Sequence, residues 1–148
     1  MTTNPEFVSF REKFKLNDLG FAVAGGWCLS VRPGQLRLGA MLLSSGSGAR
    51  SMEELTSVEQ QGMGEAFALA EKLANRVFEA DRVNYLCLMM QDPIVHFHVL
   101  PRYSNSVKRY GQVWEDPEWP APPVVMPVIS SDEVLAAVKE DLKRAFRA

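Results

Sequence analysis

The sequence predicts a domain that combines helices with a small antiparallel sheet, and three stretches carry this prediction. Residues 58–80 repeat apolar side chains at three- and four-residue steps, which is the period of an amphipathic helix. Residues 95–100 alternate apolar side chains with histidines, which is the period of a strand with two unlike faces. Pro33 and Gly34 mark a turn between two β-like stretches, which we therefore expect to form a hairpin.

Composition and charge limit the class of protein. The chain has 148 residues, of which 47% are hydrophobic and 23% charged, as expected for one globular domain spanning residues 1–148. A net charge of −2 lacks the basic surface that nonspecific binding to a nucleic-acid polymer requires. No apolar run approaches the roughly 20 residues that span a bilayer, and the first residues do not resemble a signal peptide. We therefore expect a cytoplasmic protein without membrane contact, whose Cys28 and Cys87 are reduced thiols.

The first half of the chain is predicted to hold a short helix and the hairpin. Asn4 suits the cap of a helix that runs to Lys13, with a proline and a glutamate in its first turn. Residues 19–32 are β-like, and the adjacent glycines within them indicate a turn or a bulge. Residues 36–43 are the expected partner strand.

The connection to the long helix is predicted to be flexible and then capped. Residues 44–50 are rich in glycine and serine, which is typical of a mobile surface loop. Ser51 with Glu54, and Ser57 with Gln60, both have the spacing of a capping box. The long helix is expected to begin directly after them.

The second half is predicted to hold two strands, an arm and a helix. Residues 85–90 form an apolar run of strand length, and the strand with the histidines follows as its antiparallel neighbour. Pro101 cannot donate to a strand ladder, so that strand is expected to stop near residue 100. Residues 104–130 contain two tryptophans and several prolines, and we expect an ordered arm that wraps the domain. Residues 131–148 are a predicted amphipathic helix.

The two histidines of the chain, His96 and His98, are the candidate functional residues. In a strand their rings point to one face, while Val95, Phe97 and Val99 pack on the other. Three interpretations are open. The rings are structural if their nitrogens find buried partners, they bind a metal if other side chains complete the ligand set, or they act in nucleophilic or acid–base catalysis, because neutral imidazole attacks phosphorus.

Residues 94–102, Ile-Val-His-Phe-His-Val-Leu-Pro-Arg, resemble the signature of the histidine triad (HIT) superfamily. The order of the preceding elements is similar as well: a hairpin with Pro-Gly at its turn, a strand, a long helix, and a strand that ends in Met-Gln-Asp. The resemblance covers roughly residues 21–103. It implies an α+β fold in which an antiparallel sheet of about five strands packs against one long helix, here followed by the C-terminal helix.

The resemblance also implies an activity and a set of site residues. HIT proteins cleave or transfer nucleotides at the α-phosphate, often as homodimers, and need no metal or other cofactor for the covalent chemistry. By position, His96 corresponds to the nucleophile that forms a nucleotidyl–histidine, and His98 to the histidine that contacts the phosphate and helps to protonate the leaving group. Gln91 and Gln35 correspond to positions near the substrate, the latter a histidine in many relatives. Ile94 replaces the first histidine of the triad.

We therefore expect a nucleotide hydrolase or nucleotidyl transferase that acts on a nucleotide or a dinucleoside polyphosphate, with a small nucleotide and a second copy of the chain as partners. The alternative, which Ile94 and Gln35 suggest, is a nucleotide-binding or interaction protein that has lost catalysis. A small metalloprotein is a third possibility, in which Asp92, Cys28 or Cys87 completes a site with the two histidines.

Overall fold

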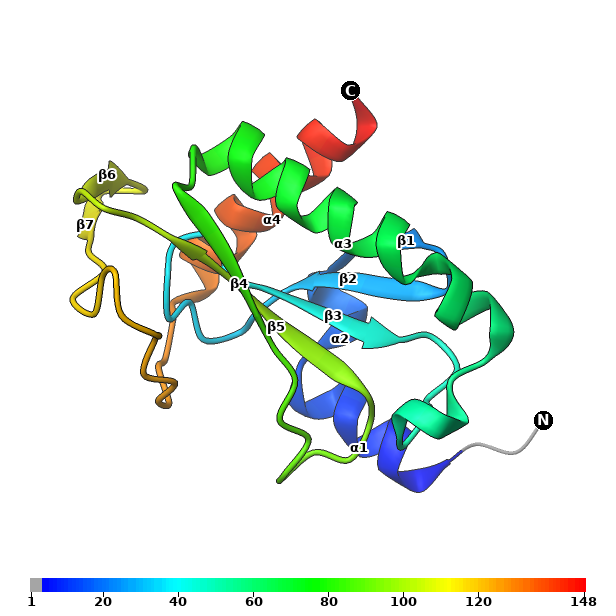
Figure 1. Ribbon diagram of the computed structural model, residues 1–148. Coiled ribbons are helices and arrows are strands. Elements are labelled where there is room, and N and C mark those ends of the chain that lie inside the picture. Colours follow the sequence, from blue (N-terminus) through cyan, green and yellow to red (C-terminus); the bar gives the residue numbers. More distant parts are fainter. Residues whose placement is uncertain (1–3) are drawn as a thin grey trace.

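The structure is a computed structural model that describes residues 4–148, and its centre is a five-stranded antiparallel sheet (Figure 1). The strands, in the spatial order β1-β2-β3-β5-β4, are β1 (Gly20–Ala24), β2 (Trp27–Val31), β3 (Met41–Ser45), β5 (His96–Arg102) and β4 (Arg82–Leu86). The helices are α1 (Pro5–Lys13), α2 (Leu16–Leu19), the 3-10 turn η1 (Met52–Glu54), α3 (Ser57–Phe78) and α4 (Asp132–Arg147). This architecture confirms the α+β prediction.

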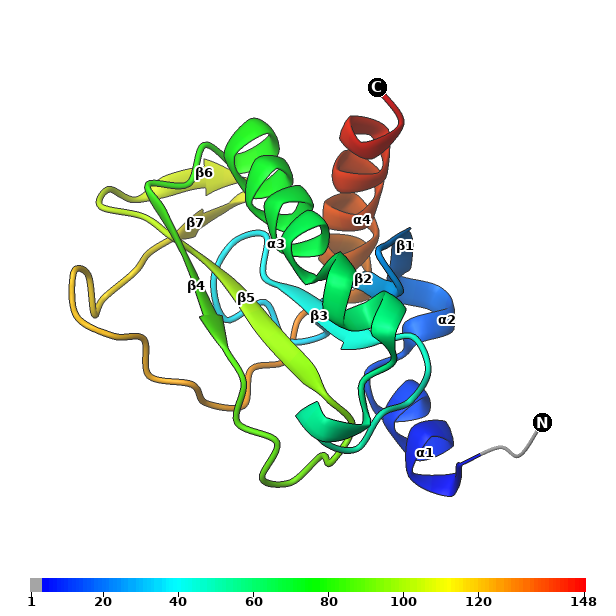
Figure 2. The ribbon, with the colours of Figure 1, turned by 45° about the vertical axis from the view of Figure 1, so that its right-hand side comes forward.

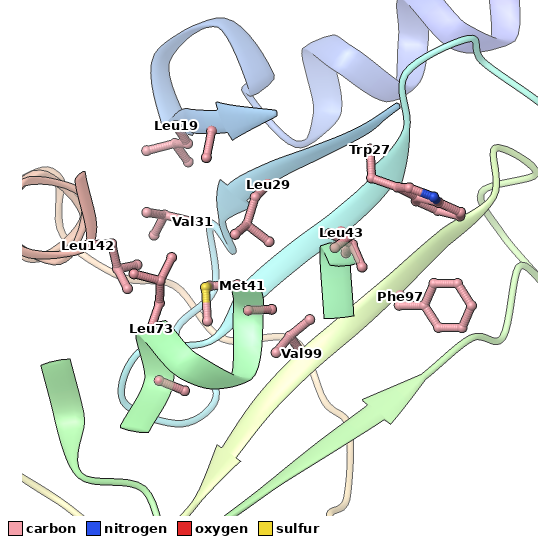
Figure 3. Packing of buried hydrophobic residues seen from close by; sticks show 14 of the residues in the cluster. Leu19, Trp27, Leu29, Val31, Met41, Leu43, Leu73, Phe97, Val99 and Leu142 are labelled. Atoms are coloured by element: carbon pink, nitrogen blue, oxygen red, sulfur yellow. The ribbon is translucent and has the colours of Figure 1, made fainter. Parts of the chain in front are cut away.

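The main core lies between the sheet and helices α3 and α4, which lie on the same side of the sheet (Figures 1 and 2). Leu73 of α3 and Leu142 of α4 point into it from the helices (Figure 3). Alternate residues of three neighbouring strands point into it from the sheet, namely Trp27, Leu29, Val31, Met41, Leu43, Phe97 and Val99 (Figure 3). Because side chains alternate along a strand, the residues between these ones lie on the opposite face.

The helices begin with the kinds of caps that the sequence predicts, but the capping box of α3 lies one residue earlier than predicted. The Asn4 side chain accepts a hydrogen bond from the backbone N–H of Glu6, so α1 begins where it was predicted to begin. The capping box of α3 is formed by Thr56 and Glu59, one residue before the predicted Ser57–Gln60 pair. The Glu59 carboxylate forms the box because it also accepts hydrogen bonds from Ser45, at the end of β3, and from Ser47 in the loop that follows.

Strand β3 begins and ends later than predicted. Its partner β2 pairs with it from Trp27–Ser45 to Val31–Met41, so residues 32–40 form the connecting loop rather than part of the strand. The loop prediction for residues 44–50 is wrong at its start, because Ser44 and Ser45 belong to β3. In the remainder of that segment Gly46, Ser47 and Arg50 are exposed, as expected for a surface loop, whereas Ala49 is buried in the main core.

Strands β4 and β5 also differ from their predicted bounds. The apolar run at residues 85–90 leaves the sheet after Leu86, and Leu88 and Met90 are 56% and 88% exposed. Strand β5 continues through Pro101 to Arg102. The ladder with β3 ends at Val99, so Pro101 has a neighbouring strand on one side only and its missing N–H breaks no bond to β3.

The segment predicted as an arm begins with a hairpin that the sequence did not indicate, formed by β6 (Val107–Arg109) and β7 (Gln112–Trp114). The chain then returns along the domain to α4 (Figure 1). Asp116, whose side chain is fully buried, lies 3.1 Å from Arg37 Nε and 2.6 Å from Arg102 Nε. This buried ion cluster fixes the arm to the loop of residues 32–40 and to β5. Ser131 caps α4 through the N–H of Val134, as predicted.

Two further findings concern the described part of the chain. Cys28 and Cys87 are free thiols. Among residues 4–148, no helix has both the length and the apolar character that crossing a bilayer requires.

Candidate functional site

Both histidines lie on the sheet face that α3 and α4 do not cover. The rings of His96 and His98 lie 5.1 Å apart, centroid to centroid, with their planes at 80°. Phe10 of α1 lies 5.1 Å from the His96 ring, and Phe14, directly after α1, lies 5.7 Å from His96 and 6.5 Å from His98. The alternation of β5 therefore brings the two imidazoles together under the N-terminal helix.

This helix closes the site. His96 is 3% exposed and His98 is 9% exposed. Lys13, at the end of α1, lies 2.9 Å from the Asp92 carboxylate in the segment before β5. Ile94 is buried against Phe10 and Phe14 in a small apolar cluster. An apolar side chain at this position therefore adds to the apolar cover of this site, and its correspondence to a triad histidine stays a prediction.

The hydrogen bonds of His96 determine which of its nitrogens is reactive. Nδ1 lies 2.6 Å from the carbonyl oxygen of Ile94. Because a carbonyl oxygen only accepts, Nδ1 carries the proton and Nε2 keeps the lone pair. Burial lowers the pKa of His96, and the hydrogen bond to Ile94 opposes this only in part. At neutral pH His96 is therefore an uncharged imidazole with a nucleophilic Nε2.

His98 has the opposite arrangement. Arg32 Nε donates to His98 Nδ1 over 3.1 Å. Because the guanidinium has only donors, Nδ1 is the acceptor and the proton of the neutral ring is on Nε2. Burial, followed by the electrostatic effects of Arg32 and of the neighbouring His96 ring, lowers the pKa of His98 to about 4. The site therefore pairs one ring that offers a lone pair with one ring that offers an N–H.

Two buried hydroxyl groups lie on the same face. Ser44 is the direct cross-strand partner of His96, and Ser30 lies on β2 opposite Leu42, which in turn pairs with His98. Both serines are fully buried, and neither hydroxyl has a hydrogen-bond partner among residues 4–148. A buried hydroxyl without a partner is costly, so Ser44 is a candidate donor to a polar group bound beside His96.

Gln35 lies in the loop of residues 32–40, and its side-chain amide is occupied by backbone groups. Nε2 donates to the carbonyls of Arg32 and Ala40, over 2.9 and 2.8 Å, and Oε1 accepts from the N–H of Gly39. The residue is 3% exposed. These contacts give Gln35 a structural role in the loop, and its predicted contact with substrate has no support from them.

Gln91 lies in the segment between β4 and β5 and is exposed. Together with Asp92, it borders a hollow of about 270 Å³ whose other wall is formed by residues of α1, including Phe10 and Lys13. Gln91 is thus near the end of α1 that covers His96, and its predicted contact with substrate phosphates stays a prediction.

Sequence reasoning did not identify Arg32, Ser44 or the two phenylalanines as site residues. The sequence did contain a signal for Arg32. Cys28, Ser30 and Arg32 alternate with the core residues of β2 and therefore share the face of the histidines. Ser44 was assigned to a loop, which concealed its pairing with His96. The described residues contain no group of three or more His, Cys, Asp or Glu side chains arranged to hold a metal ion.

Neither a protein-family model nor a curated protein sequence matches this chain. Solved structures do. A Hit-like protein involved in cell-cycle regulation from Bartonella henselae is 13% identical, with a TM-score of 0.68, and the match covers 93% of this chain and 94% of that one. A histidine triad protein from Marinobacter aquaeolei VT8 is 24% identical, with a TM-score of 0.63 and coverage of 90% and 93%. A hypothetical histidine triad nucleotide-binding protein from Sulfolobus tokodaii is 12% identical, with a TM-score of 0.64 and coverage of 95% and 91%.

Proposed function

We propose, on the premise that this chain has the histidine triad fold, that it is a nucleotide hydrolase or nucleotidyl transferase with His96 as its nucleophile. The observation that carries the proposal is the pair of hydrogen bonds that give the two rings opposite tautomers. Ile94 leaves the lone pair on His96 Nε2, and Arg32 leaves the proton on His98 Nε2. One nitrogen can attack phosphorus while the other donates to a phosphate oxygen.

In the first step, His96 Nε2 attacks the α-phosphorus of a nucleotide. A P–N bond forms, the bond from phosphorus to the leaving group breaks, and its electron pair departs with the leaving group. The ring then carries positive charge, which the Ile94 carbonyl stabilises through Nδ1–H. In the second step, water attacks the same phosphorus, the electrons of the P–N bond return to Nε2, and the proton of water is released with the nucleoside monophosphate. An alcohol or phosphate in place of water gives nucleotidyl transfer.

Two neighbouring groups support this role. The His98 Nε2–H faces the same side of β5 as His96, so it is suited to hold an oxygen of the α-phosphate or of the leaving group. The Ser44 hydroxyl, which has no hydrogen-bond partner within residues 4–148 and lies directly across from His96, is a second donor to the phosphate. Such donors act on charge that develops in the transition state, and the loss of one costs about 10²–10³-fold in rate.

Substrate access requires that α1 move away from the histidine face, because Phe10 and Phe14 cover both rings. This observation also supports the alternative function, a nucleotide-binding or interaction protein without catalysis. A protein of that kind has no need for a cover that opens in every turnover. Calorimetric binding of a nucleoside monophosphate without turnover of any nucleotide would favour this alternative.

The proposal includes a homodimer. Strand β4 is at one edge of the sheet, and an edge strand presents backbone N–H and C=O groups that can pair with another chain. The exposed Leu88 and Met90 follow this strand and add apolar area beside it. Sedimentation equilibrium is expected to give twice the monomer mass, and a monomer at all concentrations would contradict this part of the proposal.

The activity is tested with a panel of dinucleoside polyphosphates and nucleoside phosphoramidates that carry different bases. We expect turnover of at least one member and a loss of at least ~10³-fold in His96→Ala, because the nucleophile is removed. Ser44→Ala is expected to lose about 10²–10³-fold in kcat, because one donor to the phosphate is removed. Equal turnover by His96→Ala and wild type would refute the nucleophile assignment.

A further inference from the structure

The contact between Arg32 and His98 has a consequence for the kind of bond that the site can cleave. An imidazole is positively charged only when both of its ring nitrogens carry a proton. Arg32 Nε, at 3.1 Å, already directs its own proton at His98 Nδ1. Protonation of that nitrogen would place two donors against each other and break the hydrogen bond. Arg32 is itself held in position, since its Nη1 donates to the carbonyl of Gly34.

We propose that Arg32 is a positioning residue that restricts His98 to hydrogen-bond donation, and that the site therefore acts on substrates whose leaving group departs as an anion. This inference rests on the proposed function. The substrate class is a nucleotide joined through a phosphoanhydride to a second phosphate. Nucleotides joined through a P–N bond to an amine are poor substrates by the same reasoning.

The chemistry of the two leaving groups explains the preference. When His96 Nε2 attacks a phosphoanhydride, the P–O bond breaks and its electron pair departs on a phosphate oxygen, which is stable as an anion at neutral pH. An amine cannot leave as an amide anion, so its nitrogen needs a proton as the P–N bond breaks. A general acid that supplies such a proton contributes about 10²–10⁴-fold in rate. A neutral His98 that keeps its Nε2–H does not supply it.

The other charged groups around His98 do not change this conclusion. Arg32 and Lys13 are cations that disfavour a charged imidazole, and the His96 ring acts in the same direction. Asp92 is an anion that opposes them, and Lys13 lies 2.9 Å from its carboxylate. Burial is the largest cause of the low pKa and the cations add to it, so the pKa of His98 is about 4 and roughly one ring in a thousand is charged at pH 7.

The test compares two nucleotides that share one nucleoside monophosphoryl group, chosen as the nucleoside that is turned over fastest. One is joined through P–O–P to a second nucleotide, and the other through P–N to a primary alkylamine. For wild type we expect kcat/KM to favour the anhydride by at least ~10²-fold. In Arg32→Met, which removes the donor and the charge, this preference should fall by about 10-fold or more, because His98 regains a proton. Arg76→Gln, on the exposed face of α3, is the matched control and should behave as wild type.

The pKa of His98, measured by NMR titration of the ring protons, reads the same contact without any substrate. The His96→Ala protein assigns the two histidine signals. The pKa of His98 is expected to rise in Arg32→Met and to rise less in Arg32→Lys, which keeps the positive charge. Arg32→Lys also provides the test if Arg32→Met does not fold. Equal or faster cleavage of the P–N substrate by wild type, or an unchanged His98 pKa in both variants, would overturn the inference. If wild type cleaves neither substrate, the proposed function and the substrate class fail together, while the His98 pKa still decides the role of Arg32.

Discussion

Movement of α1 and Phe14 away from His96 and His98 is predicted to control how fast reagents reach the two histidines. The first perturbation is Lys13→Ala, which removes the ion pair between α1 and Asp92. The Lys13 side chain is 51% exposed, so the pair stabilises the closed state by at most about 1 kcal/mol, which corresponds to a roughly 5-fold rise in the open population. The second is Phe14→Ala. Phe14 is 8% exposed, and the loss of its ring destabilises the closed state by about 3 kcal/mol. This corresponds to a more than ~100-fold rise in the open population.

The assay is carbethoxylation by diethyl pyrocarbonate at pH 7, where both imidazoles are neutral. The chain has two histidines and both lie in the site, so the histidine signal comes from the site alone. We expect slow modification of wild type, a modest acceleration in Lys13→Ala and a large one in Phe14→Ala. Arg144→Ala, which removes an exposed ion pair on α4, is the control. Modification of wild type at the rate of free imidazole, or no acceleration in either variant, would refute the claim that α1 and Phe14 block access to the histidines.

Three further perturbations test other contacts. Gln35→Ala removes three hydrogen bonds, two of them buried and one partly buried, and is expected to lower the free energy of unfolding by about 3 kcal/mol, measured by urea denaturation. A changed KM at unchanged stability would instead support a contact of Gln35 with substrate. Asp116→Asn leaves two arginines buried without their shared anion and is expected to cost about 3–5 kcal/mol, so an unchanged urea midpoint would contradict the structural role of this cluster. Because the pKa of His98 is lower in the folded chain than in the unfolded chain, the unfolded chain binds the proton first, and stability should fall by about 2 kcal/mol, after allowance for solvent screening, as pH decreases from about 6.5 to about 4. His98→Gln should reduce this slope and leave the part that comes from His96, whose pKa burial also lowers. A flat profile for wild type would contradict the low pKa.

The periodicity of apolar and polar residues predicted those helices and strands whose own side-chain spacing is sufficient to define them. The apolar stripe of α3 and the alternation of β5 needed no tertiary information, because each places unlike side chains on its two faces. The bounds of β3 and β4 were wrong, because the register with β5 sets where a strand ends. Local apolar content, as at Leu88, does not reveal that register.

The candidate site was predictable in its centre and not in its surroundings. His96 and His98 were identifiable because a strand places them on one face. Arg32 reaches His98 across 66 residues of sequence, and such a contact depends on the order β2-β3-β5 in the sheet. Gln35 was predicted to lie near the substrate from its position after Pro33 and Gly34. Its amide is hydrogen-bonded to backbone groups of the loop, and the predicted substrate contact stays a prediction.

The central claim is that His96 Nε2 forms a covalent bond to the α-phosphorus. The most direct measurement is intact-protein and peptide mass spectrometry of the protein mixed with the nucleotide that it turns over fastest and quenched in alkaline denaturant, which preserves a P–N bond. The account predicts that the mass rises by one nucleoside monophosphoryl group, located on His96 and absent in His96→Ala. Steady product formation with no adduct on His96 at any reaction time would contradict it.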